Sequence, residues 1–185
     1  MELIIIVAII ALIVIIVATI YNRLVKLRNT ARSSWSDIDV QLKKRFDLVP
    51  SLVETVKGYA AHEKSVFEKV TEARSQAMKA GSPREAAEKD NMFSQTLKSL
   101  FAVAEAYPEL KANENFVKLQ AQFQDLENGI ESARRYYNAV VRDLNIAVES
   151  FPSNIIASMF GFKQEEFFQL DSVEERKPIK PDFSS

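Results

Sequence analysis

The sequence predicts an all-α protein in which an N-terminal transmembrane helix is followed by a long antiparallel four-helix bundle with a Phe-rich C-terminal cap. Residues 3–20 are apolar and uncharged, as in a helix that spans a bilayer. In the rest of the chain, apolar residues recur at intervals of three and four, as on one face of a helix, with no convincing alternating stretch. The 185 residues include only 4 Gly and 6 Pro, so long segments are free of helix breakers.

The apolar run is expected to stay in the membrane as an anchor over residues 1–20. It contains fourteen Leu, Ile or Val residues, three Ala and one Thr. At 1.5 Å per residue, such a helix spans roughly 27 Å, close to the thickness of the hydrocarbon core. A helix in a globular core would normally carry a polar face, and a cleaved signal peptide would have a basic start and an A-x-A-like exit. The only side-chain charge before the run is Glu2 and the exit is Ala18-Thr19-Ile20, which favours an uncleaved anchor.

The flanks of this run predict its orientation. Four cations follow it before the first acidic residue, Asp37, whereas the other flank offers only the amino terminus and Glu2. By the positive-inside rule, the N-terminus of this single-pass cell membrane protein lies outside and the C-terminal domain is cytoplasmic. The residues predicted to lie at the interface with the lipid bilayer are Tyr21, Arg23, Lys26, Arg28 and Arg32.

Residues 21–170 are expected to form the bundle, which Pro and Gly divide into four helical segments. The first segment continues the anchor helix, because nothing just after the span breaks it. Proline lacks an amide and disfavours a helical predecessor, so Pro50 predicts a kink or restart near Val49. The second segment carries one apolar stripe from Leu52 to Ala77 and is predicted to be a single helix.

The last two segments have clear N-terminal signals. Ser82, Pro83 and Glu85 form a capping box with proline at the first helical position. Asn113 is the expected N-cap of the last segment, whose stripe runs from Phe116 to Phe151 over five heptads. So regular a stripe also suits a coiled coil between chains. Burial against the other three segments avoids the entropy of association, so a bundle within one chain is favoured.

The chain after the last long segment changes in composition. Residues 151–168 hold a cluster of large apolar side chains around Gly161: Phe151, Ile155, Ile156, Met159, Phe160, Phe162, Phe167 and Phe168. A short helix and turn that cap the open end of the bundle are preferred to an exposed patch that meets lipid or a partner. Residues 171–185 are charged and contain proline, and a disordered tail is expected there.

Composition excludes most familiar catalytic chemistry. Without Cys there is no thiolate nucleophile, disulfide or Cys-ligated metal, and the single His62 does not suffice for a di-iron site, which needs Glu-x-x-His on two helices. No phosphate-binding Gly-rich motif occurs. The net charge is −1, and the Arg-Arg-Tyr-Tyr stretch at residues 134–137 is a weak nucleic-acid signal. We therefore expect no cofactor, no metal, no catalytic residue and no nucleic-acid partner.

Several polar residues lie on or near the apolar stripes. Glu63 occupies a stripe position beside His62, where a carboxylate could act as a base, but pairing with a cation such as Arg134 or a place at the bundle rim is the more ordinary role. Three Asn residues near the final stripe are expected to make buried hydrogen bonds that fix helix register: Asn115, Asn138 and Asn145.

Four blocks of the sequence closely resemble the LemA family of bacterial membrane proteins. They are Tyr21–Met78, which contains the words SSWSDIDVQLKKRFDLVPSLVETVKGY, and the stretches VAEAYPELKANENFVKLQ, ARRYYNAVVRDLN and FPSNIIASMFGF. The resemblance runs from the anchor to about residue 168, is weaker over residues 82–95 and leaves out the last seventeen residues. It implies an N-terminal span followed by an antiparallel helical bundle, and it transfers no catalytic residue.

These observations favour a non-enzymatic protein that displays a helical bundle at the inner membrane face and acts by binding unidentified protein partners or by self-assembly as a homo-oligomer. One alternative is a membrane-shaping scaffold that packs laterally through its membrane-proximal cations and its Phe-rich end. Another is an enzyme with a cryptic carboxylate site around Glu63.

Overall fold

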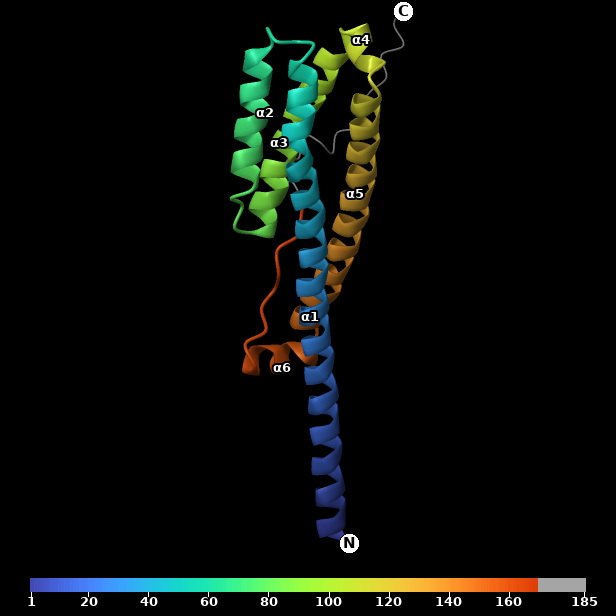
Figure 1. The fold of residues 1–185 in the computed structure, drawn as a ribbon. Helices are drawn as coiled ribbons and strands as arrows, with labels where there is room; N and C mark the ends of the chain where they lie inside the picture. The colour runs from blue at the N-terminus through green and yellow to red at the C-terminus, as the bar shows by residue number, and fades with distance from the viewer. Residues whose placement is uncertain (170–185) are drawn as a thin grey trace, which may run out of the picture.

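The computed structural model describes residues 1–169, and within this range the chain forms six helices and no strand. Figure 1 shows a long shaft, α1, with α2 to α5 gathered around its C-terminal part and α6 beside its middle. The helices are α1 (Glu2–Lys57), α2 (Lys64–Ala77), α3 (Pro83–Glu105), α4 (Pro108–Lys111), α5 (Glu114–Glu149) and α6 (Ser153–Met159). The all-α prediction is confirmed.

Helix α1 has two parts that differ in what surrounds them. Its first fifteen residues, 2–16, are all exposed, and it is the one described helix that is long and apolar enough to cross a membrane. From Leu24 onward, one face is buried in the bundle. The helix passes from one part to the other without a break, as predicted, and its 56 residues extend roughly 84 Å.

Of the predicted kink or restart near Val49, the restart was wrong, because α1 continues through Pro50 to Lys57. Proline cannot supply the amide hydrogen that would bond to the carbonyl of Phe46, four residues earlier. That carbonyl accepts a hydrogen bond from Nε of Arg74 on α2 at 2.7 Å. A side chain from a neighbouring helix therefore replaces the hydrogen bond that the proline removes.

The single helix predicted from Leu52 to Ala77 was also wrong, because residues 58–63 form a turn between α1 and α2. The amides of Tyr59 and Ala60 both bond to the carbonyl of Val56, which closes the end of α1. Ala60 is buried in this turn, whereas Tyr59 is exposed. The regular spacing continues across the turn, so periodicity alone does not reveal it.

The predicted caps of the later helices are present. The Ser82 hydroxyl accepts a hydrogen bond from the amide of Glu85, and the Glu85 carboxylate accepts one from the amide of Gly81, one residue before the cap. Oδ1 of Asn113 accepts hydrogen bonds from the amides of Asn115 and Phe116 at the start of α5. Helix α5 ends at Glu149, so Phe151 lies beyond it and is exposed.

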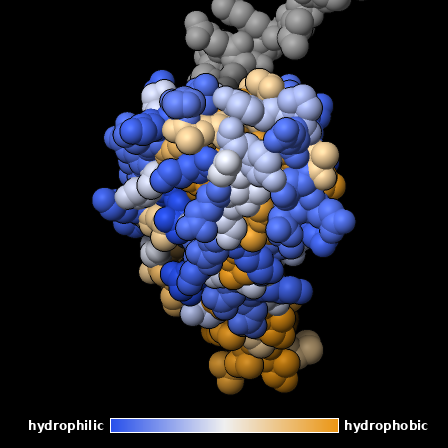
Figure 2. All heavy atoms as spheres, turned by 45° about the horizontal axis from the view of Figure 1, so that its top comes forward, coloured by the Kyte–Doolittle hydropathy of each residue, from blue (hydrophilic) through white to orange (hydrophobic). Residues whose placement is uncertain are grey.

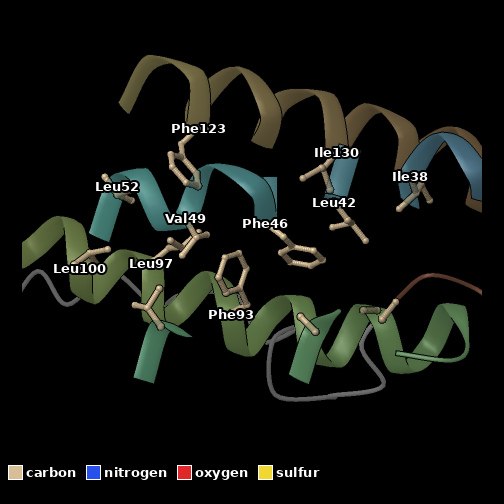
Figure 3. Close-up of a cluster of buried hydrophobic side chains, with 14 of the residues drawn as sticks. Ile38, Leu42, Phe46, Val49, Leu52, Phe93, Leu97, Leu100, Phe123 and Ile130 are labelled. Carbon is tan, nitrogen blue, oxygen red and sulfur yellow. The ribbon is translucent and has the colours of Figure 1, made fainter. Parts of the chain in front are cut away.

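The C-terminal half of α1 with α2, α3 and α5 forms the predicted antiparallel four-helix bundle. Each of these long helices runs opposite to the one before it, α1 packs along α5, and α2 packs along α3. Figure 3 shows the core at the centre of the bundle, where Phe46 of α1 meets Phe93 of α3 edge to face at 5.3 Å between ring centroids. Around this pair lie Ile38, Leu42, Val49, Leu52, Leu97, Leu100, Phe123 and Ile130, all buried.

The chain after α5 packs beside α1 at one end of the bundle. This is the end from which the apolar part of α1 extends. Helix α6 lies across α1 in Figure 1, and an extended segment, residues 162–169, returns along the bundle. In this part of the chain Ile156, Phe162 and Phe168 are buried, whereas Phe151 and Phe160 are exposed. The Phe-rich end thus both covers bundle surface and presents an apolar surface of its own.

Candidate membrane interface

The five predicted interface residues lie on α1 where its exposed apolar part ends. Arg23, Lys26 and Arg32 are exposed. Tyr21 is partly covered by two rings, Phe160 at 4.8 Å and Phe162 at 5.8 Å between centroids. These contacts connect the start of the bundle to a segment about 140 residues later in the chain, which local sequence patterns do not reveal.

Arg28 also contacts the C-terminal segment. Its guanidinium carbon lies 4.7 Å from the ring centroid of Phe162, as in a cation–π contact. Arg28 is half-buried, unlike its three exposed cationic neighbours in the predicted set. Its charge is therefore held against the C-terminal segment, while the other three cations are free to meet solvent or lipid head groups.

The turn after α6 places Phe162 against α1. The amide of Phe162 donates to the carbonyl of Ala157, and the amide of Gly161 donates to the carbonyl of Ser158. This is a Schellman motif, in which the residue after the cap adopts a left-handed conformation; Gly161 has φ +69° and carries no Cβ that would oppose it. The chain then reverses, and Phe162 joins a buried cluster with Leu24 and Ile156.

Four large apolar side chains on α6 and immediately beside it are uncovered. The exposed fractions are 81% for Phe151, 52% for Ile155, 70% for Met159 and 51% for Phe160. No charged residue occurs from residue 151 to residue 162. In Figure 2, hydrophobic atoms gather at the end of the molecule where α1 begins, whereas the visible bundle surface is mainly hydrophilic.

Two asparagines of α5 hold the returning segment. Asn138 donates from Nδ2 to the carbonyl of Phe168 at 3.1 Å and accepts at Oδ1 from the amide of the same residue at 2.8 Å. Asn145 makes the same pair of hydrogen bonds with Glu165, at 3.0 and 2.9 Å. The side chains predicted to fix helix register thus bind the C-terminal segment. Asn115 lies in the first turn of α5, where its backbone amide bonds to the cap.

The end of the described chain packs into an aromatic cluster. The Phe168 ring lies 5.9 Å from that of Trp35 and 4.8 Å from the guanidinium carbon of Arg134. The hydroxyl of Tyr137, whose ring is 5.8 Å from Trp35, donates to the carbonyl of Glu166 at 2.8 Å. Burial, followed by the charges of Glu165 and Glu166, raises the pKa of Tyr137 to about 12.

A second candidate site is a cleft of about 440 Å³ between α3 and α5. Arg45 of α1 forms its floor and pairs with Asp90 of α3 and, at 2.6 Å, with Glu127 of α5. Burial lowers the pKa of Arg45, while the charge of Glu127 opposes this effect. Both carboxylates are engaged by the same guanidinium, and Phe101 and Lys98 lie farther along the cleft.

The sequence does carry a signal for this buried charge pair. Arg45 follows Leu42 by three positions, and Asp90 precedes Phe93 by three, so each lies on the apolar stripe of its helix. Opposite charges on two stripes that face one core indicate a buried ion pair.

The predicted stripe position of Glu63 was wrong, because this residue lies at the N-cap position of α2, in the turn at the end of the bundle, which corresponds to the rim alternative. It borders a shallow surface depression with Val103 and Tyr107, whereas Arg134 lines the α3–α5 cleft. Within residues 1–169, no group of three or more His, Asp or Glu side chains is placed to hold a metal ion.

Comparison with known proteins gives consistent family matches. The model of the LemA family matches residues 34–183. The match thus begins after Tyr21 and continues past residue 168, so the expected end of the resemblance was wrong. The predicted tail at residues 171–185 lies outside the described residues.

Three relatives match most of the chain. The Magnetosome protein MamQ 2 of Paramagnetospirillum magneticum is 26% identical, over 87% of this chain and 69% of its own length. The MamQ of Magnetospirillum gryphiswaldense is 25% identical over the same shares. The Protein LemA of Metamycoplasma hominis is 24% identical, over 83% of this chain and 70% of its own length.

Proposed function

Because this chain belongs to the LemA family, we propose that it is a single-pass membrane protein that holds a helical bundle at the cytoplasmic face of the bacterial cell membrane and acts by binding other proteins. The observation that carries the proposal is the continuity of α1. Its exposed apolar part and its bundle-forming part are one helix, so insertion of the first part into lipid orients the second.

The charges around the apolar part support the proposed orientation. Arg23, Lys26 and Arg32 are exposed just after it, where each gains about 1 kcal/mol from anionic lipid. The bilayer is thus the first partner. The N-terminus lies outside and the bundle inside, as the positive-inside rule requires.

A binding role suits the surface of the bundle better than catalysis does. The most enclosed charged groups, Asp90 and Arg45, neutralise one another, and the relatives' names refer to a cellular structure or to the family and to no reaction. Exposed apolar side chains occur singly on the bundle, for example Met92, Val117 and Tyr136, and offer contact points for partner proteins.

The test combines topology with crosslinking in cells. In the Cys-free chain, Val117→Cys places a label at the end of the bundle far from the span. We expect it to resist an impermeant maleimide in intact cells and to react after lysis. Extraction of the full chain by alkaline carbonate, or labelling in intact cells, would overturn the proposed anchoring or orientation.

Photo-crosslinking residues at Met92, Val117 and Tyr136 test the binding role. We expect at least one position to trap a defined protein, and the yield to fall when a neighbouring exposed residue is made charged. Ile10, within the proposed span, is the matched control and should trap none of the same proteins. Crosslinks only between copies of this chain would favour the self-assembling scaffold instead.

A further inference from the structure

We propose that α6 is a second membrane contact: it lies in the lipid–water interface beside the span, and its outward side chains Ile155 and Met159 insert among the lipids together with the flanking Phe151 and Phe160. This inference rests on the proposed anchoring of α1. It adds an interaction surface whose partner is a lipid surface.

The position of α6 along α1 is the first argument. Phe160 packs against Tyr21, the residue that directly follows the apolar run, with the two rings tilted by 59°. Ile156 and Ala157 on the inner face of α6 share a buried cluster with Leu24, and Val17 and Ile20 pack against it. Helix α6 therefore lies at the level where α1 leaves the hydrocarbon core, and Figure 1 shows it crossing α1 and not running along it.

The composition of α6 is the second argument. To cover α1 it needs one apolar face, which Ile156 and Ala157 provide. Of its exposed residues, Ile155 and Met159 are large and apolar, Asn154 and Ser158 are polar but uncharged, and no charge interrupts residues 151–162. Surface helices in water usually carry charged or polar residues on the side away from the core. A short uncharged helix with large apolar side chains on the outside suits burial at the head-group and acyl-chain boundary.

Lipid is favoured over a protein as the occupant because the patch is continuous with the span. Phe160, at the end of α6, lies next to Tyr21, and the exposed apolar side chains of α1 extend from there to the N-terminus. Exposed cations follow both apolar elements in the chain, Arg23 after the apolar run of α1 and Lys163 after α6, where anionic head groups would meet them.

A second contact restricts how the bundle stands on the membrane. A single span leaves the bundle free to rotate about the axis of α1. A helix that inserts to one side of this axis fixes which face of the bundle is turned toward the lipid. The returning segment and the bonds of Asn138 and Asn145 tie α6 to α5, so the restriction reaches the rest of the bundle.

The test uses nitroxide labels on the full chain, reconstituted in vesicles of phosphatidylethanolamine and phosphatidylglycerol. Ile155→Cys and Met159→Cys report on α6, and Ile10→Cys reports on the span. Val117→Cys is the matched control, because Val117 is also apolar and its exposed fraction, 50%, is similar to the 52% of Ile155. Power saturation compares collisions with oxygen, which concentrates in lipid, and with a water-soluble nickel chelate. Circular dichroism checks that each variant stays helical.

We expect oxygen to dominate at positions 10, 155 and 159 and the nickel chelate to dominate at position 117. Nickel access at 155 and 159 equal to that at 117, with position 10 still in lipid, would overturn this inference and leave the anchoring intact. Nickel access at position 10 would overturn the anchoring itself. Labels at 155 and 159 shielded from both reagents and broadened by a second label would assign the patch to another copy of the chain, which also overturns the lipid contact.

Discussion

Nε of Arg74 on α2 donates a hydrogen bond of 2.7 Å to the carbonyl oxygen of Phe46 on α1. In an unbroken helix this carbonyl would accept from the amide of residue 50, and Pro50 has none. The contact satisfies a carbonyl that a buried helix would otherwise leave unpaired, and it ties α2 to α1 at the position of the proline.

Replacing Arg74 by Met is therefore expected to lower the free energy of unfolding by about 1–3 kcal/mol, because the Phe46 carbonyl loses its partner. In a Pro50→Ala background the restored amide takes over, so the same replacement should cost less. Pro50 is exposed, so alanine fits there without a clash in the core. Urea unfolding in detergent, followed by circular dichroism, gives the free energy of unfolding of the natural chain, the two single variants and the double variant. Equal losses in both backgrounds would contradict this account of the proline.

The buried ion pair predicts unequal effects for two similar substitutions. The side chains of Arg45 and Asp90 are 1% and 5% exposed, whereas that of Glu127 is 50% exposed. Asp90→Asn leaves a buried guanidinium without its enclosed partner and should cost about 3–5 kcal/mol. Glu127→Gln, at a solvated position, should cost less than about 1 kcal/mol.

The same unfolding measurement shows whether Asp90→Asn lowers the free energy of unfolding more than Glu127→Gln does. Glu131→Gln is the surface control, because Glu131 forms an exposed pair with Arg135 on the same helix. A loss for Asp90→Asn no larger than for this control would mean that the buried pair contributes nothing to folding.

The asparagine contacts predict local and not global loosening. Asn138→Asp and Asn145→Asp keep the size and the acceptor of each side chain, remove its donor, and place a carboxylate beside a backbone carbonyl. Hydrogen exchange should quicken over residues 162–169 while the buried parts of α1 and α5 keep their protection. Asn128→Asp is the control, because Asn128 is exposed and bonds only within its own helix turn. Equal exchange in all three variants would contradict the proposed role.

Gly129 offers a stabilising substitution. A Cβ built at this position would lie 3.6 Å from Cδ of Gln41, an ordinary van der Waals contact. Gly129→Ala should therefore raise the free energy of unfolding by about 1 kcal/mol through helix propensity alone. A decrease would show that α1 and α5 need the glycine for their approach.

The sequence predicts features whose partners are close in the chain. The caps at Ser82 and Asn113 lie within three residues of the amides they bind, and the apolar stripes describe much of the core on the long helices. The hydrogen bond from Arg74 to Phe46 joins residues 28 positions apart and is accepted by a backbone carbonyl, which every residue type has, so the sequence does not predict it. The sequence does not predict the pairing of Asn138 with the backbone of Phe168 for the same reason.

The candidate membrane interface shows the same division. Its cations are recognisable because charge beside an apolar run is a local signal. The packing of Phe160 and Phe162 on Tyr21 depends on where α5 ends and on the turn at Gly161, which together bring distant segments side by side. The composition of residues 151–162 predicts an apolar surface, but only the three-dimensional arrangement shows which of these side chains are covered by α1.

Stability at alkaline pH should depend on Tyr137. Its pKa is raised to about 12 from the ordinary value of 10.0, so the fold favours the neutral phenol, which donates to the Glu166 carbonyl. A raised pKa stabilises the fold fully below pH 10.0, and the contribution is lost as pH rises toward about 12. The difference in unfolding free energy between the natural chain and Tyr137→Phe should therefore shrink over this interval. Tyr136→Phe is the matched control, because the ring of Tyr136 is exposed. Parallel curves for the two variants would show that the Tyr137 hydroxyl titrates alike in the folded and unfolded chain.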